Sequence, residues 1–425
     1  MAGSLLELVL EPAPAGAGVQ IGPRSIDRFV VQMASPAPAP NAAWWDAGLW
    51  DAQLWSTGTW AWVDVTCDVR EVDCERGRDS PLERFRVGVA RIVLANRDRK
   101  YSTIDPPASS PYVVAGRSIL GAGTIMRIGY MSDNGWQATF TGVCEQWSDV
   151  PDYTTGDEAA NVTLTETTAD LATIDRPAVA PIGNLDAAQP RLDRLLEDAG
   201  WRWPRRYNNG LAGNLQATTM AGNRLAECYL SADSILEGRF YADVDGAARY
   251  DGTGWLPGIP VGTISGAVPG DLNPVEMILA DDTLRMVNDV SYSRVGGTVQ
   301  RVVDSASRER FGTFTGQRLD LIATADAKIL ELATAAVTRG AWDVRRVDGF
   351  TLNYPASIVA PGAPLTLCRF MAQVQLRNLV NLRLSSGAIT STVEAVRHHL
   401  RFGGTPPEWE VSISVQRQDP AGPYT

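Results

Sequence analysis

Few residues in this chain have side chains suited to catalysis or metal binding. His398 and His399 are its two histidines, and neighbouring residues in a strand point to opposite faces, so the pair cannot jointly hold a metal ion or relay a proton. Cys67 and Cys74 are seven positions apart, a spacing that fits neither a zinc knuckle nor a redox pair. Because the five cysteines are scattered and odd in number, we expect buried, reduced thiols and no disulfide framework.

Glycine and lysine patterns predict no nucleotide site. The two lysines, Lys100 and Lys328, lie outside any G-K-[ST] context, which excludes a phosphate-binding P-loop. Gly121 and Gly123 resemble the start of a dinucleotide-binding loop, but Met126 stands where its third glycine is needed, so a turn is favoured. Neither H-E-x-x-H nor G-x-S-x-G occurs. We therefore expect no cofactor.

Two acidic clusters also favour turns. Asp243, Asp245 and Gly246 resemble part of a calcium loop, but Gly252 stands where its twelfth-position Glu is needed, so a hairpin turn explains them better. The adjacent Asp281 and Asp282 are expected in a solvated turn. Glycoside hydrolysis needs only two carboxylates brought together in space, which the sequence does not exclude. We nevertheless predict a protein without catalytic or metal-binding residues.

The composition indicates a water-soluble, turn-rich protein. The chain has 425 residues, of which 44% are hydrophobic, and a net charge of −11. The 39 glycines and 26 prolines favour many turns over long helices. An acidic balance argues against bare nucleic acid as the main partner. The N-terminus lacks the features of a signal peptide and no apolar run approaches the roughly 20 residues of a membrane span, so we expect synthesis and folding in a cytoplasm.

Tryptophan recurs in one unusual segment, residues 41–62. Trp45, Trp50, Trp55 and Trp60 are spaced by five residues, which fits neither a strand nor a helix. We therefore expect an irregular loop. Three interpretations stay open: a loop packed by its own indoles, an anchor buried against a neighbouring protein, or a glycan-binding surface.

Periodicity predicts the order of the elements. Alternating or continuous apolar runs indicate strands, and apolar residues at i, i+3, i+4 and i+7 indicate helices. We expect strands at residues 6–10, 29–32, 91–94 and 408–416, helices at 192–199, 225–236 and 326–339, and hairpins at 239–250 and 288–303. The hairpin at 239–250 should turn through a type I′ turn at Asp245-Gly246, and Thr324 or Asp326 should cap the third helix. After residue 351 we expect strands.

The predicted fold class is mainly β with a small α-helical insert. We expect an N-terminal β-barrel-like domain at residues 1–165 that includes the Trp-rich loop (41–62), and a Pro-rich linker at 166–190. A central region with helices and β-hairpins should cover residues 186–309, and a C-terminal β domain with one helix residues 310–425.

The order of several segments resembles the minor tail, or tail-tip hub, proteins of long-tailed phages of actinobacteria. The segments are WVDVTCDVREVDCERGR (62–78), GVARIVLANRDRKY (88–101), SPYVVAGRSI (110–119), MRIGY (126–130), LDRLLEDAGW (192–201), LAECYLSADSILEGRFYADVDGAARYDG (225–252) and VNDVSYSRVGGTVQRVVDSASRERFG (287–312). None is a catalytic motif. The resemblance rests on their shared order.

The resemblance implies a structural virion protein at the distal end of a siphovirus tail, assembled in the host cytoplasm. Such a hub is a homotrimer whose two related barrel-like domains per chain present a pseudo-sixfold ring to the sixfold tail. It closes the tail tube, takes part in host attachment and genome ejection, and contacts the distal tail ring protein, the tape-measure protein and receptor-binding proteins. Acidic residues facing the channel would keep the passing DNA from adhering. The alternatives are a carbohydrate-binding adhesin of the tail tip and a tail-associated cell-wall hydrolase.

Overall fold

The computed structural model describes most of the chain between residues 28 and 417. The described ranges are 28–36, 60–80, 83–114, 116–132, 135–150, 158–208, 214–236, 238–252, 259–265, 268, 271–342, 345–354, 363–384, 387–402 and 408–417. The strand expected at residues 6–10, and Trp45, Trp50 and Trp55, lie outside them.

A large, mostly antiparallel sheet of 13 strands dominates the fold, in the order β16-β20-β23-β22-β3-β4-β9-β8-β7-β1-β2, with β21 beside β22 and β15 beside β21. Its strands are β1 (Arg28–Pro36), β2 (Trp60–Asp64), β3 (Val69–Gly77), β4 (Arg86–Ala95), β7 (Ile125–Ser132), β8 (Gly135–Val150), β9 (Ala159–Glu166), β15 (Thr263–Ile264), β16 (Glu276–Asp281), β20 (Arg345–Tyr354), β21 (Leu379–Leu384), β22 (Gly387–Arg401) and β23 (Glu408–Arg417). The described strands do not close into a barrel. The mainly β fold class is confirmed.

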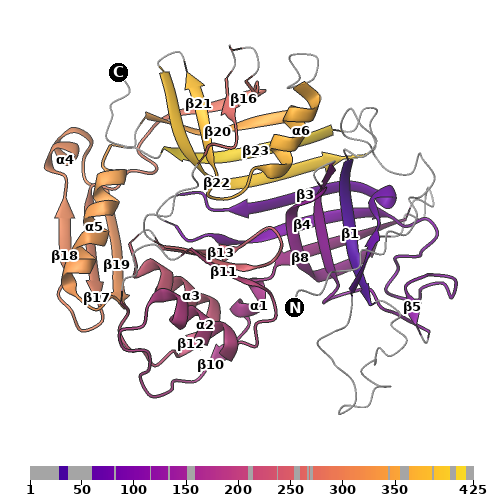
Figure 1. Cartoon of the computed structure of the whole chain (residues 1–425), viewed down its shortest axis with the longest axis horizontal. Helices are drawn as coiled ribbons and strands as arrows, with labels where there is room; N and C mark the ends of the chain where they lie inside the picture. Colours follow the sequence, from indigo (N-terminus) through magenta and orange to yellow (C-terminus); the bar gives the residue numbers. More distant parts are fainter. Residues whose placement is uncertain are drawn as a thin grey trace. The chain divides into compact units, whose positions relative to one another are not determined.

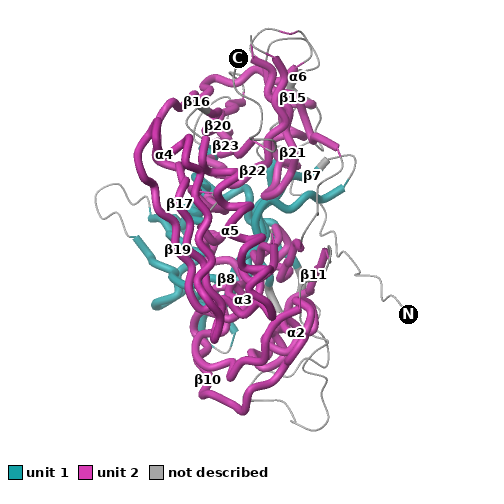
Figure 2. Tube along the Cα trace, turned by 90° about the vertical axis from the view of Figure 1, so that its left-hand side faces the viewer, with its two compact units in different colours: residues 1–73, 90–164, 400–407 teal, residues 74–89, 165–399, 408–425 magenta. Residues whose placement is uncertain are grey.

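The chain divides into two compact units, coloured separately in Figure 2. Unit 1 comprises Met1–Asp73, Ala90–Leu164 and Leu400–Pro407, and unit 2 comprises Cys74–Val89, Thr165–His399 and Glu408–Thr425. Strands β3, β4, β9 and β22 therefore each contribute residues to both units.

Unit 1 is built around β1, which pairs antiparallel with β2 on one side and β7 on the other. Consecutive residues Phe29, Val30 and Val31 are all fully buried, because both faces of this strand are covered. The apolar run at 29–32 thus predicts a strand correctly. Next to β2 lies the short 3-10 helix η1 (Thr66–Asp68), and the two-residue strands β5 (Val113–Val114) and β6 (Arg117–Ser118) form a separate hairpin.

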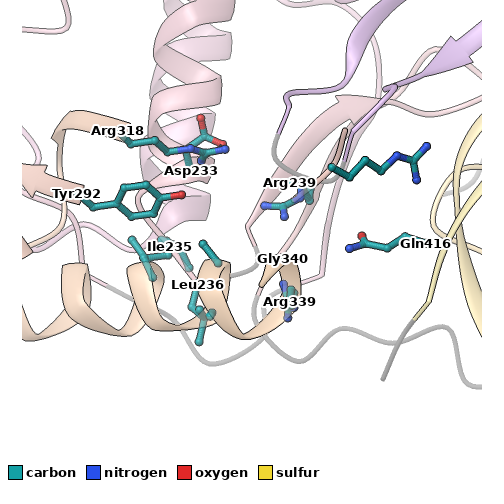
Figure 3. A pocket seen from close by; sticks show the side chains of 13 residues that line it. Asp233, Ile235, Leu236, Arg239, Tyr292, Arg318, Arg339, Gly340 and Gln416 are labelled. Atoms are coloured by element: carbon teal, nitrogen blue, oxygen red, sulfur yellow. The ribbon is translucent and has the colours of Figure 1, made fainter. Parts of the chain in front are cut away.

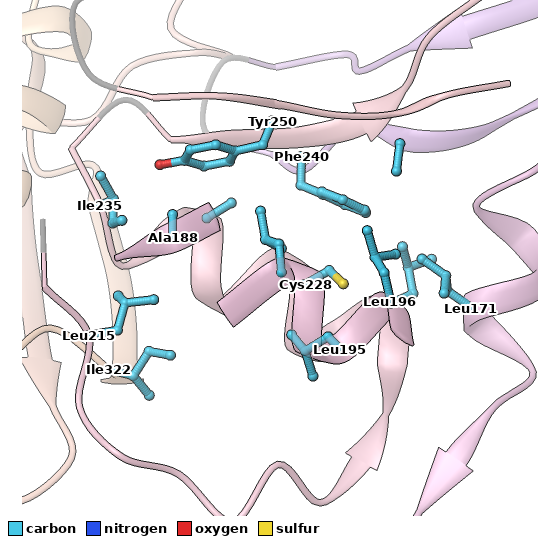
Figure 4. Close-up of a cluster of buried hydrophobic side chains, with 14 of the residues drawn as sticks. Leu171, Ala188, Leu195, Leu196, Leu215, Cys228, Ile235, Phe240, Tyr250 and Ile322 are labelled. Atoms are coloured by element: carbon cyan, nitrogen blue, oxygen red, sulfur yellow. The ribbon is translucent and has the colours of Figure 1, made fainter. Parts of the chain in front are cut away.

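Part of unit 2 is a small helical region packed on a three-stranded sheet (Figure 1). Its elements are α1 (Ala169–Ala172), β10 (Asp175–Arg176), α2 (Ala188–Asp198), β11 (Arg205–Asn208), β12 (Gly222–Asn223), α3 (Arg224–Asp233), β13 (Arg239–Ala242) and β14 (Ala248–Asp251). Leu195 and Leu196 of α2, Cys228 of α3 and Phe240 of β13 share one buried cluster, shown in Figure 4. Burial of this apolar face, more than helix propensity, holds such short helices together.

A second part of unit 2 places one helix across a three-stranded sheet (Figure 1). Its elements are β17 (Asp289–Arg294), β18 (Gln300–Val303), α4 (Ser305–Phe311), β19 (Thr315–Leu321) and α5 (Asp326–Gly340). The fully buried Ile329 and Ala333 of α5 pack in one cluster with Val290 of β17. The helix periodicity and the hairpin signal at Gly296-Gly297 thus predict this region correctly.

Several local predictions are wrong in detail. Helix α3 ends at Asp233, short of residue 236. The hairpin turn runs from Asp243 to Ala247, and its positive φ falls on Gly246 but not on Asp245, whereas a type I′ turn needs it at both central residues. Helix α5 is capped by Ala325 without a side-chain hydrogen bond.

The C-terminal part and the Trp-rich segment also differ from expectation. Helix α6 (Ala363–Gln373) lies in the region where we expected strands. Its apolar residues do not alternate as those of a half-buried strand do. The end of the predicted loop at 41–62 belongs to strand β2, which begins at Trp60. No helix among the described residues is long and apolar enough to cross a membrane.

Candidate functional site

Of the four candidate tryptophans, Trp60 alone lies in the described residues, where it pairs with Pro36 at the start of β2. Two residues later, Trp62 lies against Arg127 of β7, whose guanidinium carbon is 4.1 Å from the indole centroid. Trp136 of β8 lies 4.6 Å from the same guanidinium. Arg127 also donates from Nε to Gln32 Oε1 at 2.6 Å. The arginine therefore joins two tryptophans through cation–π contacts within unit 1.

A buried ionic network lies at the end of β3 in unit 2, where Arg76 and Arg78 flank Gly77. Arg78 Nε bonds Glu394 Oε2 at 2.6 Å, and both side chains are at most 4% exposed. Arg377 Nη1 lies 3.9 Å from Glu394 Oε1. Burial alone would raise the pKa of the Glu394 carboxyl, but the charges of Arg78 and Arg377 outweigh it and lower that pKa.

Arg76 forms the second half of this network with Glu166 of β9. Glu166 also accepts the backbone N–H of Gly88 at 2.7 Å, and Arg76 donates to the carbonyl of Ala242. A methyl group on Gly88 would lie 2.6 Å from Glu166 Cδ, so this close approach requires glycine. The two arginines thus connect β3 to β9, β13 and β22 through paired, buried charges. Removing only one partner of such a pair strongly destabilises the folded protein, because the remaining charge stays buried without compensation.

The two aspartates of the hairpin turn form ion pairs with nearby arginines. Asp243 Oδ2 lies 2.9 Å from Arg206 Nη1 and 3.1 Å from Arg249 Nη1. Burial alone would raise the pKa of Asp243, but Arg249 and the Val244 N–H lower it. Asp245 also pairs with Arg206 at 2.5 Å. Both carboxylates are occupied by arginine, as expected of a structural turn and not of a calcium loop.

The histidines occupy different environments on β22. His398 is 2% exposed, and its Nδ1 accepts the indole N–H of Trp409, whereas His399 is partly exposed. The expectation of buried thiols is wrong for Cys67, which is the one exposed thiol among the described free cysteines. Partial burial and the neighbouring Asp68 raise its pKa, which disfavours the reactive thiolate. Asp281 ends strand β16 and does not lie in the expected turn, whereas Asp282 follows the strand and binds Arg346 at 3.0 Å. Among the described residues, no group of three or more His, Cys, Asp or Glu side chains could hold a metal ion.

Sequence reasoning missed Arg76, Arg78, Glu166 and Glu394. A usable signal was present in the segment 62–78: two arginines separated by one glycine lie on the same face of a strand. If that face is buried, both need carboxylate partners. The partners themselves are 90 and 316 positions away along the chain, so the sequence alone does not identify them.

Comparison with known proteins gives a match in fold but not in sequence. No family model and no curated protein matches this chain. A tail protein from Neisseria meningitidis MC58 superposes with a TM-score of 0.56 at 10% identity, covering 91% of this chain and 95% of its own. This chain has the fold of a tail protein. The 43 kDa tail protein of prophage MuSo2 from Shewanella oneidensis matches similarly, with a TM-score of 0.54 at 11% identity, covering 91% of this chain and 96% of its own.

Proposed function

We propose that this chain is a structural protein of a phage tail and acts, without catalysis, as the hub at the distal tail tip. The observation that carries the proposal is the fold match to two tail proteins along nearly the full length of all three chains. The ordered segments that resemble actinobacteriophage hubs support the same position in the tail. The buried ion pairs Arg76–Glu166 and Arg78–Glu394 also fit a structural protein, because they hold neighbouring strands together and leave no reactive group.

The proposed assembly is a homotrimer. Residues 1–165 and 310–425 would each supply one of two related β units per chain, so that three copies offer six similar surfaces to the sixfold distal tail ring. The central region, 186–309, would close the channel until ejection. Through this position the hub would contact the distal tail ring protein, the tape-measure protein and receptor-binding proteins.

The net charge of −11 fits a channel through which DNA passes. Carboxylates on the channel wall would repel the phosphates of the DNA and prevent the DNA from adhering to the wall. Salt screens this repulsion beyond about one Debye length, roughly 8 Å at physiological salt. In an assembled particle, a channel lined by neutral or basic side chains would remove this part of the proposal.

The tryptophan segment is proposed as an assembly or packing element, and its three interpretations predict different outcomes. Double replacement of Trp50 and Trp55 by alanine should unfold the chain if the indoles pack on themselves. A folded chain that fails to enter tails indicates an anchor against a neighbour. A folded, assembled chain that no longer binds purified cell wall indicates a glycan surface.

Two experiments test the proposal against its alternatives. Gold-labelled antibody against this chain should decorate the distal end of intact tails, and labelling along the tail shaft or on the capsid would contradict a hub. Purified protein should leave peptidoglycan intact. Release of soluble muropeptides that is lost on replacing one carboxylate would identify a cell-wall hydrolase instead.

A further inference from the structure

A pocket in unit 2 is lined by four arginines. It has a volume of about 70 Å³ and lies where α3, β13, α5 and the sheet of β17 and β19 meet (Figure 3). The arginines are Arg239, Arg285, Arg318 and Arg339. A pocket of this size holds a few water molecules or the charged head of a small acid.

Two carboxylates beside these arginines are each shared between two guanidinium groups, and the charge of Glu394 also acts on Arg239 and Arg339. Asp233 lies 3.3 Å from Arg318 and 2.8 Å from Arg84. Asp348 lies 3.4 Å from Arg285 and 2.6 Å from Arg346.

Arg239 is the least satisfied of the four. Among the described residues it has no carboxylate within salt-bridge distance, and its one hydrogen bond runs from Nη1 to the carbonyl of Gly238 at 2.7 Å. Its Nε is buried and has no partner. Burial and the nearby charges of Arg78 and Arg377 lower its pKa to about 9. A buried, unpaired guanidinium N–H calls for an anion or a water molecule beside it.

The other wall of the pocket selects among anions. On its α5 side it presents Leu332, Ala335 and Ala336. Leu236 and Tyr292 also line the pocket (Figure 3). Apolar side chains favour contact with hydrocarbon, whereas a fully charged phosphate would face them without hydrogen bonds. A planar carboxylate matches the donor fork of arginine in both geometry and charge.

We infer that this pocket binds a carboxylate carried on a short hydrocarbon stem, with Arg239 as its principal ligand and the α5 side chains around the stem. Two sources share this chemistry: a free short-chain acid, and an acidic side chain of a neighbouring protein. Binding of a carboxylate by the isolated chain does not depend on the proposed tail position, whereas the second source rests on the proposed function.

The test is calorimetric titration of the full-length protein with butyrate, acetate and inorganic phosphate at constant ionic strength. Butyrate should bind more tightly than acetate or phosphate. Arg239→Gln should weaken butyrate binding at least tenfold, and so should Arg339→Gln, with circular dichroism showing that both variants are folded. Arg86→Gln, which removes an exposed arginine paired with Asp79 outside the pocket, should bind as the parent does.

Absence of butyrate binding to the parent protein, or unchanged binding by folded Arg239→Gln, would overturn the inference. Tighter binding of phosphate than of butyrate would overturn the assignment to carboxylates. Native mass spectrometry then separates the two sources. A small acid retained through purification indicates a free ligand, whereas a pocket that binds butyrate in the free chain but not in assembled tails indicates a neighbour's side chain.

Discussion

Trp409 donates its indole N–H to Nδ1 of His398 at 3.4 Å, and the two rings stack with their centroids 6.1 Å apart. Both side chains are almost fully buried. Because Nδ1 accepts this bond, His398 is neutral with its proton on Nε2. Burial, followed by the charge of Arg76, lowers the pKa of His398 to about 3.

This arrangement predicts acid sensitivity. In the unfolded chain the histidine takes up a proton below about pH 6.5, whereas in the folded chain it stays neutral until about pH 3. His398 thus contributes stability that is fully present above pH 6.5 and is lost as the pH falls. The free energy of unfolding should fall by up to about 1.4 kcal/mol per pH unit from this group.

Urea unfolding at pH 6.5, 5.5 and 5.0 measures the effect. His398→Gln keeps an acceptor for Trp409 but removes the titration, so its stability should depend less steeply on pH than that of the parent. The control is His399→Gln on the other face of β22, which should keep the parental slope. Equal slopes for the parent and His398→Gln would show that the buried ring does not govern the acid response.

The Arg78–Glu394 pair predicts a large and asymmetric stability effect. Glu394→Gln leaves the buried Arg78 without its counter-charge and should lower the free energy of unfolding by about 3–5 kcal/mol. Replacing both residues by methionine should recover part of that loss, because the charge of Arg78 is removed together with that of Glu394. Glu83→Gln, which removes an exposed partner of Arg86, should change stability by less than about 0.5 kcal/mol. A small loss for Glu394→Gln would mean that the network is not buried as described.

Replacement of Gly77 should reduce stability through a steric clash, in addition to the backbone strain of its positive φ. Its φ is +124°, and a Cβ there would lie 2.3 Å from the carbonyl oxygen of Glu394. Gly387 has a similar φ of +136° with open space around it. Gly387→Ala should therefore cost about 1–2 kcal/mol for strain alone, and Gly77→Ala clearly more, because β3 and β22 would have to separate. Thermal unfolding of both variants measures the difference, and equal losses would contradict the close strand approach.

The Trp62–Arg127–Trp136 contacts predict a smaller loss within unit 1. Arg127→Met keeps an aliphatic side chain but removes the cation, and should lower the free energy of unfolding by about 1–2 kcal/mol and change tryptophan fluorescence. Arg117→Met, at an exposed position of β6, is the control and should leave both unchanged. Unaltered fluorescence in Arg127→Met would mean that the guanidinium does not lie between the indoles.

Local periodicity predicted β1, β4, β23, α2, α3, α5 and the hairpins β13–β14 and β17–β18, but left most strands of the 13-stranded sheet unassigned. Long-range pairing accounts for much of what it missed. The apolar spacing of Leu192, Leu195 and Leu196 predicts α2 because one face alone carries the core. Helix α6 was missed although Leu367, Phe370 and Met371 recur at helical spacing, because the region after residue 351 was interpreted as strands throughout. The ionic network was missed because Glu166 and Glu394 come to Arg76 and Arg78 only through strand order, which single-sequence patterns do not encode. Trp45, Trp50 and Trp55, the core of the predicted site, lie outside the described residues.

The copy number of this chain in purified, intact particles tests the central claim most directly. Quantitative mass spectrometry against the distal tail ring protein, taken as six copies, supplies the count. The hub proposal predicts three copies per particle at the tail axis. Six copies would indicate a ring protein, and a variable or much larger number a peripheral protein, and either result would contradict a trimeric hub.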